Sequence, residues 1–210
     1  MFTGLVEAIG TVCLVAPSGA GVRLGIDVTG LRRAPVRGAS IAVNGACLTV
    51  TDIDGPVAFF DAVRETARRT TLASLRPGAR VNLEGALCLG DALDGHMVLG
   101  HVDATGVLQG QERLPGSVVM RFSLPEAIGG LVAEKGSVAV AGVSLTVVDV
   151  DRASFSVSLI PETLARTTLG FLASGDAVNL EADVLARYVL RMQTWTGGGL
   201  TLEKLRAAGF

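Results

Sequence analysis

The sequence has few of the residues that build metal sites, disulfide frameworks and aromatic surfaces. Its 210 residues include two histidines and three cysteines, and aromatic residues make up only 4%. Cys13, Cys47 and Cys88 are odd in number and show no Cys-x-x-Cys spacing. This pattern argues against both a disulfide framework and a zinc site. We therefore expect neither a bound metal nor a cofactor.

Charge and long apolar runs are also scarce. Charged residues make up 18%, the formal net charge is −2, and no basic cluster is present, so the sequence lacks the electrostatic footprint of a nucleic-acid binder. No apolar run approaches the roughly 20 residues that cross a bilayer. Residues 1–5 contain neither a basic leader nor a secretory signal. These features predict a cytoplasmic protein that binds a small molecule and neither membrane nor nucleic acid.

The sequence is rich in apolar residues, at 49%, and it contains two tandem copies of one module. Residues 40–50 align with residues 137–147 at an offset of 97, and seven of the eleven pairs are identical. The same offset aligns Val81-Asn-Leu-Glu84 with Val178-Asn-Leu-Glu181. The repeat therefore predicts two similar domains, residues 1–93 and 94–183.

Each copy has the pattern of short strands separated by glycine, proline and aspartate. The strands predicted for the first copy are residues 4–12, 22–28, 40–52, 57–62 and 80–84. A short helix is predicted to begin near Glu65 and to end before Pro77. Several short strands and one helix favour a small closed antiparallel barrel, because closure removes exposed strand edges. The predicted fold class is all-β, with two barrels in tandem.

The C-terminal residues 184–210 have a helical pattern instead. Leu185, Tyr188, Val189 and Met192 follow the spacing i, i+3, i+4, i+7 of an apolar helical stripe. A second short helix is predicted at residues 201–210, with Thr201 as its N-cap. The stripe either packs on the chain's own barrels or contacts another subunit.

Several motifs resemble those of riboflavin synthase in order and spacing. They are Met-Phe-Thr-Gly-Leu-Val-Glu at residues 1–7, Val-Asn-Gly-Ala-Cys-Leu-Thr-Val at 43–50, Gly-His-Met-Val-Leu-Gly-His-Val-Asp at 95–103, Gly-Val-Ser-Leu-Thr-Val at 142–147, and a Leu-Glu-Lys-Leu tail ending in Gly-Phe. The resemblance extends along essentially the whole chain.

The resemblance implies a homotrimer of tandem six-stranded barrels, each binding one 6,7-dimethyl-8-ribityllumazine, with residues 184–210 as a trimerisation segment. It implies a dismutation in which one lumazine gives four carbons to another, yielding riboflavin and 5-amino-6-ribitylaminouracil. In the family, the productive pair lies between the N-terminal barrel of one subunit and the C-terminal barrel of its neighbour. An association with lumazine synthase is a further prediction.

Differences between the two copies mark candidates for chemistry. Cys47 aligns with Ser144, and each could present a nucleophile or a proton-transfer group. His101 aligns with Leu5 and suits a proton shuttle from the acidic 7-methyl group, because its unperturbed pKa lies near working pH. Lys135 aligns with Gly38, and Asp183 with Ala86; either charge could stabilise a lumazine anion. The predicted catalytic residues are therefore Cys47, His101, Ser144, Lys135 and Asp183.

Each of these assignments has a structural alternative. Cys47 could be a small buried side chain, His101 a satisfied barrel histidine, and Lys135 and Asp183 ordinary surface charges. His96 has no ligand cluster nearby in the sequence and is interpreted as structural.

Residues shared by both copies are assigned to ligand binding. Thr49 and Thr146 are expected to hydrogen-bond the pyrimidine edge of the ring. The other predicted binding residues, most of them on strips implied by the resemblance, are Phe2, Gly4, Leu5, Val6, Ser40, Leu48, Asp61, Ala62, Val63, Arg64, Glu65, Thr66, Gly100, Val102, Leu145, Ser158, Leu159, Ile160, Pro161, Glu162 and Thr163.

Some positions depart from the family pattern. They are Arg64, Ala67, Asp94, Leu99, Ala104, Ala141 and Glu162. Ala141 replaces a common aspartate and Glu162 a common histidine, and both belong to the second copy. Two alternative functions follow: a lumazine- or flavin-binding homologue without turnover, and a specialised synthase that acts on a modified lumazine.

Overall fold

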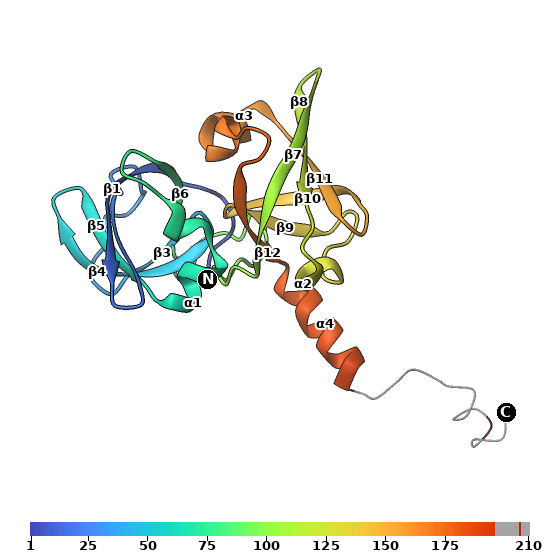
Figure 1. The fold of residues 1–210 in the computed structure, drawn as a ribbon, viewed down its shortest axis with the longest axis horizontal. Helices are drawn as coiled ribbons and strands as arrows, with labels where there is room; N and C mark the ends of the chain where they lie inside the picture. The colour runs from blue at the N-terminus through green and yellow to red at the C-terminus, as the bar shows by residue number, and fades with distance from the viewer. Residues whose placement is uncertain (196–205, 207–210) are drawn as a thin grey trace.

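Two closed six-stranded antiparallel barrels lie next to each other, and one helix projects from the second (Figure 1). The computed structural model describes residues 1–195 and Arg206. The first barrel consists of β1 (Ala8–Ser18), β2 (Gly21–Asp27), β3 (Ser40–Val43), β4 (Ala46–Asp54), β5 (Val57–Ala62) and β6 (Arg80–Gly85), with α1 (Arg64–Arg69) and the 3₁₀ turn η1 (Thr71–Ser74) before β6. The predicted all-β fold class is confirmed.

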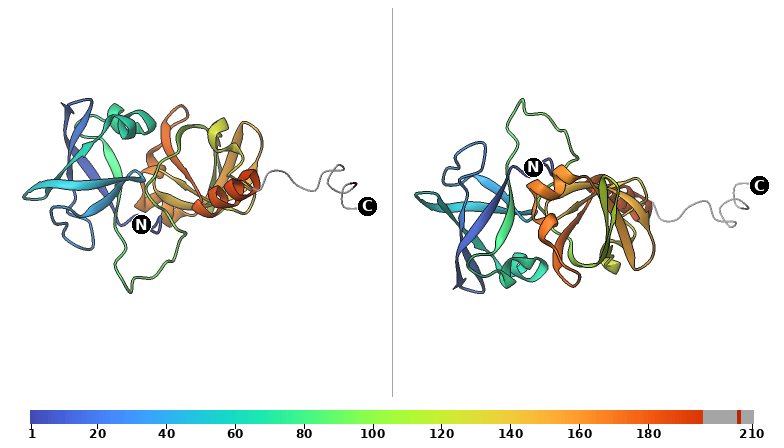
Figure 2. Two further views of the ribbon diagram at one scale, coloured as in Figure 1. Left: turned by 90° about the horizontal axis from the view of Figure 1, so that it is seen from below. Right: turned by 90° about the horizontal axis from the view of Figure 1, so that it is seen from above.

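The second barrel repeats the first element by element. It consists of β7 (Ala104–Leu114), β8 (Ser117–Ser123), β9 (Ser137–Val140), β10 (Val143–Val150), β11 (Ser154–Leu159) and β12 (Ala177–Ala182), with α2 (Glu126–Gly129), α3 (Pro161–Arg166) and η2 (Thr168–Phe171). Around the ring, β7-β8-β11-β10-β9-β12 matches β1-β2-β5-β4-β3-β6. Both copies also carry one bulge in the first strand and one in the fourth, where an extra residue bends the strand. The segment that joins the barrels loops outward (Figure 2).

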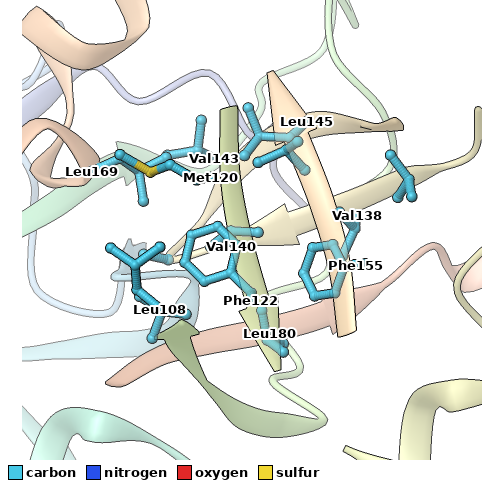
Figure 3. Packing of buried hydrophobic residues seen from close by; sticks show 14 of the residues in the cluster. Leu108, Met120, Phe122, Val138, Val140, Val143, Leu145, Phe155, Leu169 and Leu180 are labelled. Carbon is cyan, nitrogen blue, oxygen red and sulfur yellow. The ribbon is translucent and has the colours of Figure 1, made fainter. Parts of the chain in front are cut away.

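Alternation along each strand places apolar side chains inside its barrel. In β6, Val81 and Leu83 are fully buried in the first core. Phe122 and Phe155 stack in the second core with ring centroids 5.7 Å apart, among the residues shown in Figure 3. Buried apolar side chains thus form one core inside each barrel.

The strand predicted at residues 40–52 is a hairpin. Asn44 and Gly45 both have positive φ, 46° and 79°, and form the two-residue turn between β3 and β4. An Asn-Gly pair favours such a turn, because its strand twist requires left-handed backbone at both positions. The second copy makes the same turn with Ala141 at φ 48° and Gly142 at φ 80°.

Ala141 therefore occupies a strained backbone position, and Ala141→Asn is expected to raise the free energy of unfolding by about 1 kcal/mol. Asparagine tolerates this region better than alanine. In the first copy, the amide oxygen of Asn44 also accepts the backbone N–H of Asn82 at 2.8 Å, an acceptor that Ala141 lacks. Denaturant unfolding measures the change. Asn44→Ala is the matched reverse variant, and an A141N protein no more stable than the parent would contradict the expectation.

Helix α4 (Val184–Trp195) extends from the end of the second barrel, away from the first (Figure 1). Arg187 anchors its first turn through an ion pair of 2.8 Å with Asp103. The predicted stripe of Leu185, Tyr188, Val189 and Met192 is on α4, and each of the four side chains is more than half exposed. The helix predicted at 201–210 lies outside the described residues apart from Arg206. Within the described part of the chain, no helix is long and apolar enough to cross a membrane.

Candidate active site

The two barrels exchange the segments that precede their first strands. Phe2 and Val98 form an antiparallel bridge between these segments, with both side chains fully buried. The carbonyl of Gly4 accepts the backbone N–H of Ser144 in the second barrel at 2.8 Å. The carbonyl of Gly100 accepts the backbone N–H of Cys47 in the first barrel at 2.9 Å. Each segment therefore lies against the hairpin of the opposite barrel.

This exchange creates two equivalent pockets. The first pocket, of about 140 Å³, is lined by Ala46, Cys47, Glu65, Thr66, Arg69, Thr70, Gly100, His101 and Val102. The second pocket, of about 250 Å³, is lined by Gly4, Leu5, Val6, Arg32, Val143, Ser144, Glu162, Thr163, Arg166 and Thr167. The repeat aligns nine pairs of these residues. The structure thus places Cys47 with His101 in one pocket, and Ser144 with Leu5 in the other.

Ser144 has a partner that the sequence did not predict. Nδ1 of His96 lies 2.7 Å from Oγ of Ser144, and only 8% of the His96 residue is exposed. Burial lowers the pKa of His96 below its usual value, and the nearby charge of Asp183 opposes this change. A neutral imidazole can accept the hydroxyl proton of Ser144. Within residues 1–195 and 206, Nε2 of His96 is buried without a hydrogen-bond partner.

A glutamate–arginine pair lies beside each pocket. Glu65 binds Arg69 one turn later on α1, and hydrogen bonds from Arg69 and then Arg68 lower the pKa of Glu65. Glu162 makes the equivalent pair with Arg166 on α3 at 3.4 Å. Glu162, which departs from the family pattern, therefore restores in the second copy the pair found in the first. In each pocket the charge of this arginine is therefore paired with that of the glutamate.

Other predicted catalytic residues lie outside the pocket linings. Lys135 is exposed on a turn at φ 63°, and its counterpart Gly38 has φ 88° at the same turn. Oδ1 of Asp183 accepts the backbone N–H of Leu185 at 2.9 Å, which caps the start of α4. Asp183 also faces His96 closely enough to affect its pKa. The geometry thus relates Asp183 to the Ser144–His96 pair, whereas Lys135 stands apart.

Apart from Ser40, the predicted binding residues fall into three groups. Those that line the two pockets are Gly4, Leu5, Val6, Glu65, Thr66, Gly100, Val102, Glu162 and Thr163. Those buried in the barrels or between them are Phe2, Leu48, Ala62, Leu145 and Leu159. Those exposed on strands or at helix starts are Thr49, Asp61, Val63, Arg64, Thr146, Ser158, Ile160 and Pro161.

Ser40 lines a different cavity, with a volume of about 440 Å³. This cavity lies between residues 31–36 and residues 85–91, and its charged lining residues are Glu7, Arg32, Arg33 and Asp91. Arg33 and Asp91 already neutralise each other, with N···O 2.7 Å, and hydrogen bonds from Arg33 and the Cys88 N–H lower the pKa of Asp91 to about 2. Within residues 1–195 and 206, no group of three or more His, Cys, Asp or Glu side chains is arranged to hold a metal.

Comparison with known proteins identifies the family of the chain. The family model for the lumazine binding domain matches residues 3–86 and 99–183. A riboflavin synthase of Mycobacterium tuberculosis is 46% identical over 94% of this chain and all of its own length. A riboflavin synthase of Chlamydia pneumoniae is 42% identical over 88% of this chain and 90% of its own.

A solved structure, LumP complexed with 6,7-dimethyl-8-(1'-D-ribityl) lumazine, has the same fold. Its TM-score is 0.76 at 23% identity, and the match covers 87% of this chain and 99% of that one. With the family model matching both barrels and the relatives matching almost end to end, the chain belongs to the riboflavin synthase family, with two lumazine binding domains.

Proposed function

We propose that this protein is a transferase that converts two molecules of 6,7-dimethyl-8-ribityllumazine into riboflavin and 5-amino-6-ribitylaminouracil. The observation that carries this proposal is the pair of pockets, which share most of their lining but differ at the reactive positions. Identical reactants must play opposite roles in a dismutation. Two similar pockets with different chemical groups meet that requirement, and holding both reactants oriented replaces a rare encounter in solution.

The Ser144–His96 pair is the proposed base for the acidic 7-methyl proton. Neutral His96 takes the hydroxyl proton of Ser144, so that Oγ can accept a proton from the bound lumazine. Cys47 and His101 provide a thiol and an imidazole in the first pocket. The four carbons move from donor to acceptor, so carbon and electrons balance between the two products without an external oxidant.

Assembly into a homotrimer remains a prediction, as do association with lumazine synthase and a cytoplasmic location. The exposed apolar stripe of α4 supports contact with another subunit over packing on the chain's own barrels. The domain limits 1–93 and 94–183 likewise remain a proposal. They enclose one barrel each, but both pockets use residues from either side of the boundary.

Purified protein given only 6,7-dimethyl-8-ribityllumazine is expected to form riboflavin and 5-amino-6-ribitylaminouracil in equal amounts. Chromatography with absorbance detection measures both products, in buffer without metal or nucleotide. A bound lumazine spectrum with no riboflavin after long incubation would instead indicate a binding protein. Slow turnover of this lumazine together with faster turnover of a modified lumazine would indicate a specialised synthase.

A further inference from the structure

Four buried polar side chains on the last strands of the two barrels hydrogen-bond segments that frame the pockets: the two asparagines reach the opposite barrel, and the two glutamates hold the segment that precedes their own barrel. In β6, Asn82 and Glu84 alternate with the core residues, and in β12 Asn179 and Glu181 do the same. All four are at most 5% exposed. Buried amides and carboxylates are costly unless they are hydrogen-bonded, so their partners indicate their role.

Asn179, in the second barrel, bonds two segments that frame the first pocket. Its Nδ2 donates to the carbonyl of Asn44 at 2.8 Å, in the hairpin turn before Cys47. Its Oδ1 accepts the backbone N–H of Thr71 at 2.8 Å, directly after the pocket residue Thr70. One side chain of the second barrel thus connects two walls of a pocket on the first barrel.

Glu181 holds the third wall of the same pocket. Its carboxylate accepts the backbone N–H groups of Leu99 at 2.8 Å and Gly100 at 3.0 Å. The carbonyl of Gly100 in turn accepts the Cys47 N–H. Glu181 therefore fixes the peptide that carries His101 against the peptide that carries Cys47.

The first barrel does the same for the second pocket. Nδ2 of Asn82 donates to the carbonyl of Ala141 at 2.9 Å, and its Oδ1 accepts the N–H of Thr168 at 2.7 Å. Glu84 accepts the N–H groups of Thr3 and Gly4 at 2.6 and 3.0 Å. The carbonyl of Gly4 then accepts the Ser144 N–H.

We propose that Asn179 and Glu181 are positioning residues of the first pocket, and Asn82 and Glu84 positioning residues of the second. Each barrel holds the pocket of the other barrel in shape. The inference rests on the proposed function, because it concerns how these pockets bind a lumazine.

One difference between the copies suggests a substitution that is expected to strengthen binding in the first pocket. The hydroxyl of Thr3 donates to Glu84 at 2.8 Å and accepts the N–H of Leu5 at 3.0 Å. The equivalent residue in the second copy is Leu99, which has no hydroxyl. Burial raises the pKa of Glu181 and the pKa of Glu84, so an added donor stabilises the ionised form. Leu99→Thr is therefore expected to fix the His101 segment more firmly.

The test measures the occupancy of each pocket separately through a thiol. In a C13S/C88S full-length protein, Cys47 is the remaining cysteine and reports on the first pocket. In a C13S/C47S/C88S/S144C protein, the thiol introduced at position 144 reports on the second. The rate of alkylation by iodoacetamide is measured against the concentration of 6,7-dimethyl-8-ribityllumazine. The lumazine concentration that halves the alkylation rate, the half-protection concentration, is the apparent dissociation constant of that pocket.

Asn179→Ala and Glu181→Gln are expected to raise the half-protection concentration about tenfold in the first pocket and less than about twofold in the second. Asn82→Ala and Glu84→Gln are expected to give the opposite pattern. Leu99→Thr is expected to lower the first-pocket value about threefold without changing the second. Because L99T is a gain, impaired folding cannot produce it.

Equal weakening of both pockets would overturn the proposal and assign these residues a general structural role. The proposal would also be overturned if Asn179→Ala and Glu181→Gln weakened binding only in the second pocket, and Asn82→Ala and Glu84→Gln only in the first. No change in affinity in any variant would overturn it as well. A ligand that protects neither thiol in the two parent proteins would contradict the proposed function itself. The two failures are therefore distinguishable.

Discussion

Replacement of His96 by glutamine is expected to lower kcat for riboflavin formation about 100-fold while changing the lumazine affinity by less than about threefold. Glutamine keeps an amide that can bond Ser144 but cannot take its proton at neutral pH. The expectation follows from the 2.7 Å contact between Nδ1 of His96 and Oγ of Ser144, and from the burial that keeps the imidazole neutral. Single-turnover and steady-state kinetics separate binding from chemistry.

The pH profile provides a second measurement of the same pair. Because burial lowers the pKa of His96, the neutral base persists below pH ~6.5, and the acidic limb of kcat/KM is expected there. That limb is expected to disappear in H96Q. Ser144→Ala combined with H96Q is expected to cost little more than either change alone, since the two groups act as a unit. Fully additive losses, or an unchanged acidic limb in H96Q, would contradict the assignment.

Gly100→Ala is expected to destabilise the chain by about 3 kcal/mol and to lower activity by about 100-fold. A Cβ at this position would lie 2.5 Å from Cβ of Cys47 and 2.8 Å from its backbone nitrogen, at φ 78°. Neither group is the end of a flexible side chain, so the His101 segment must move away from Cys47. Denaturant unfolding and initial rates measure the two effects.

Gly116→Ala is the matched control. Gly116 has φ 82°, but a Cβ there would meet no heavy atom within 4 Å. Backbone strain alone is expected to cost about 1 kcal/mol and to leave activity unchanged. Equal destabilisation by G100A and G116A would show that the contact with Cys47 is unimportant and that strain explains both.

The repeat and the apolar patterning were sufficient to predict the barrels, because strands such as β8 bury every second side chain. The hairpin at Asn44 was missed because apolar residues continue on both sides of a two-residue turn, so residues 40–52 have the pattern of one strand. Its signal was present in the Asn-Gly pair. The Ala-Gly pair of the second copy carries no such signal, since alanine rarely adopts positive φ.

The candidate site was predicted as a set of residues but not as two pockets. Aligning the copies compares Cys47 with Ser144, and Leu5 with His101, but it does not show that His101 crosses to Cys47. That arrangement depends on the exchange of segments between barrels, which is a long-range contact. The contact between His96 and Ser144 was not predicted for the same reason, because the two residues are 48 positions apart. The available sequence signal for contacts between the barrels was the polar residues within an apolar strand, such as those in Val-Asn-Leu-Glu.

The span of the Asn179 hydrogen bonds has a consequence for synthesis. Asn179 lies 135 residues after Asn44, whose carbonyl it binds, and 108 residues after Thr71. Closing such distant contacts is slow compared with local folding, and the ribosome supplies the residues in order. The first barrel can complete its core once β6 has emerged. Its pocket, however, is expected to gain its final shape only after β12 has emerged, so a nascent chain acquires both pockets at nearly the same time.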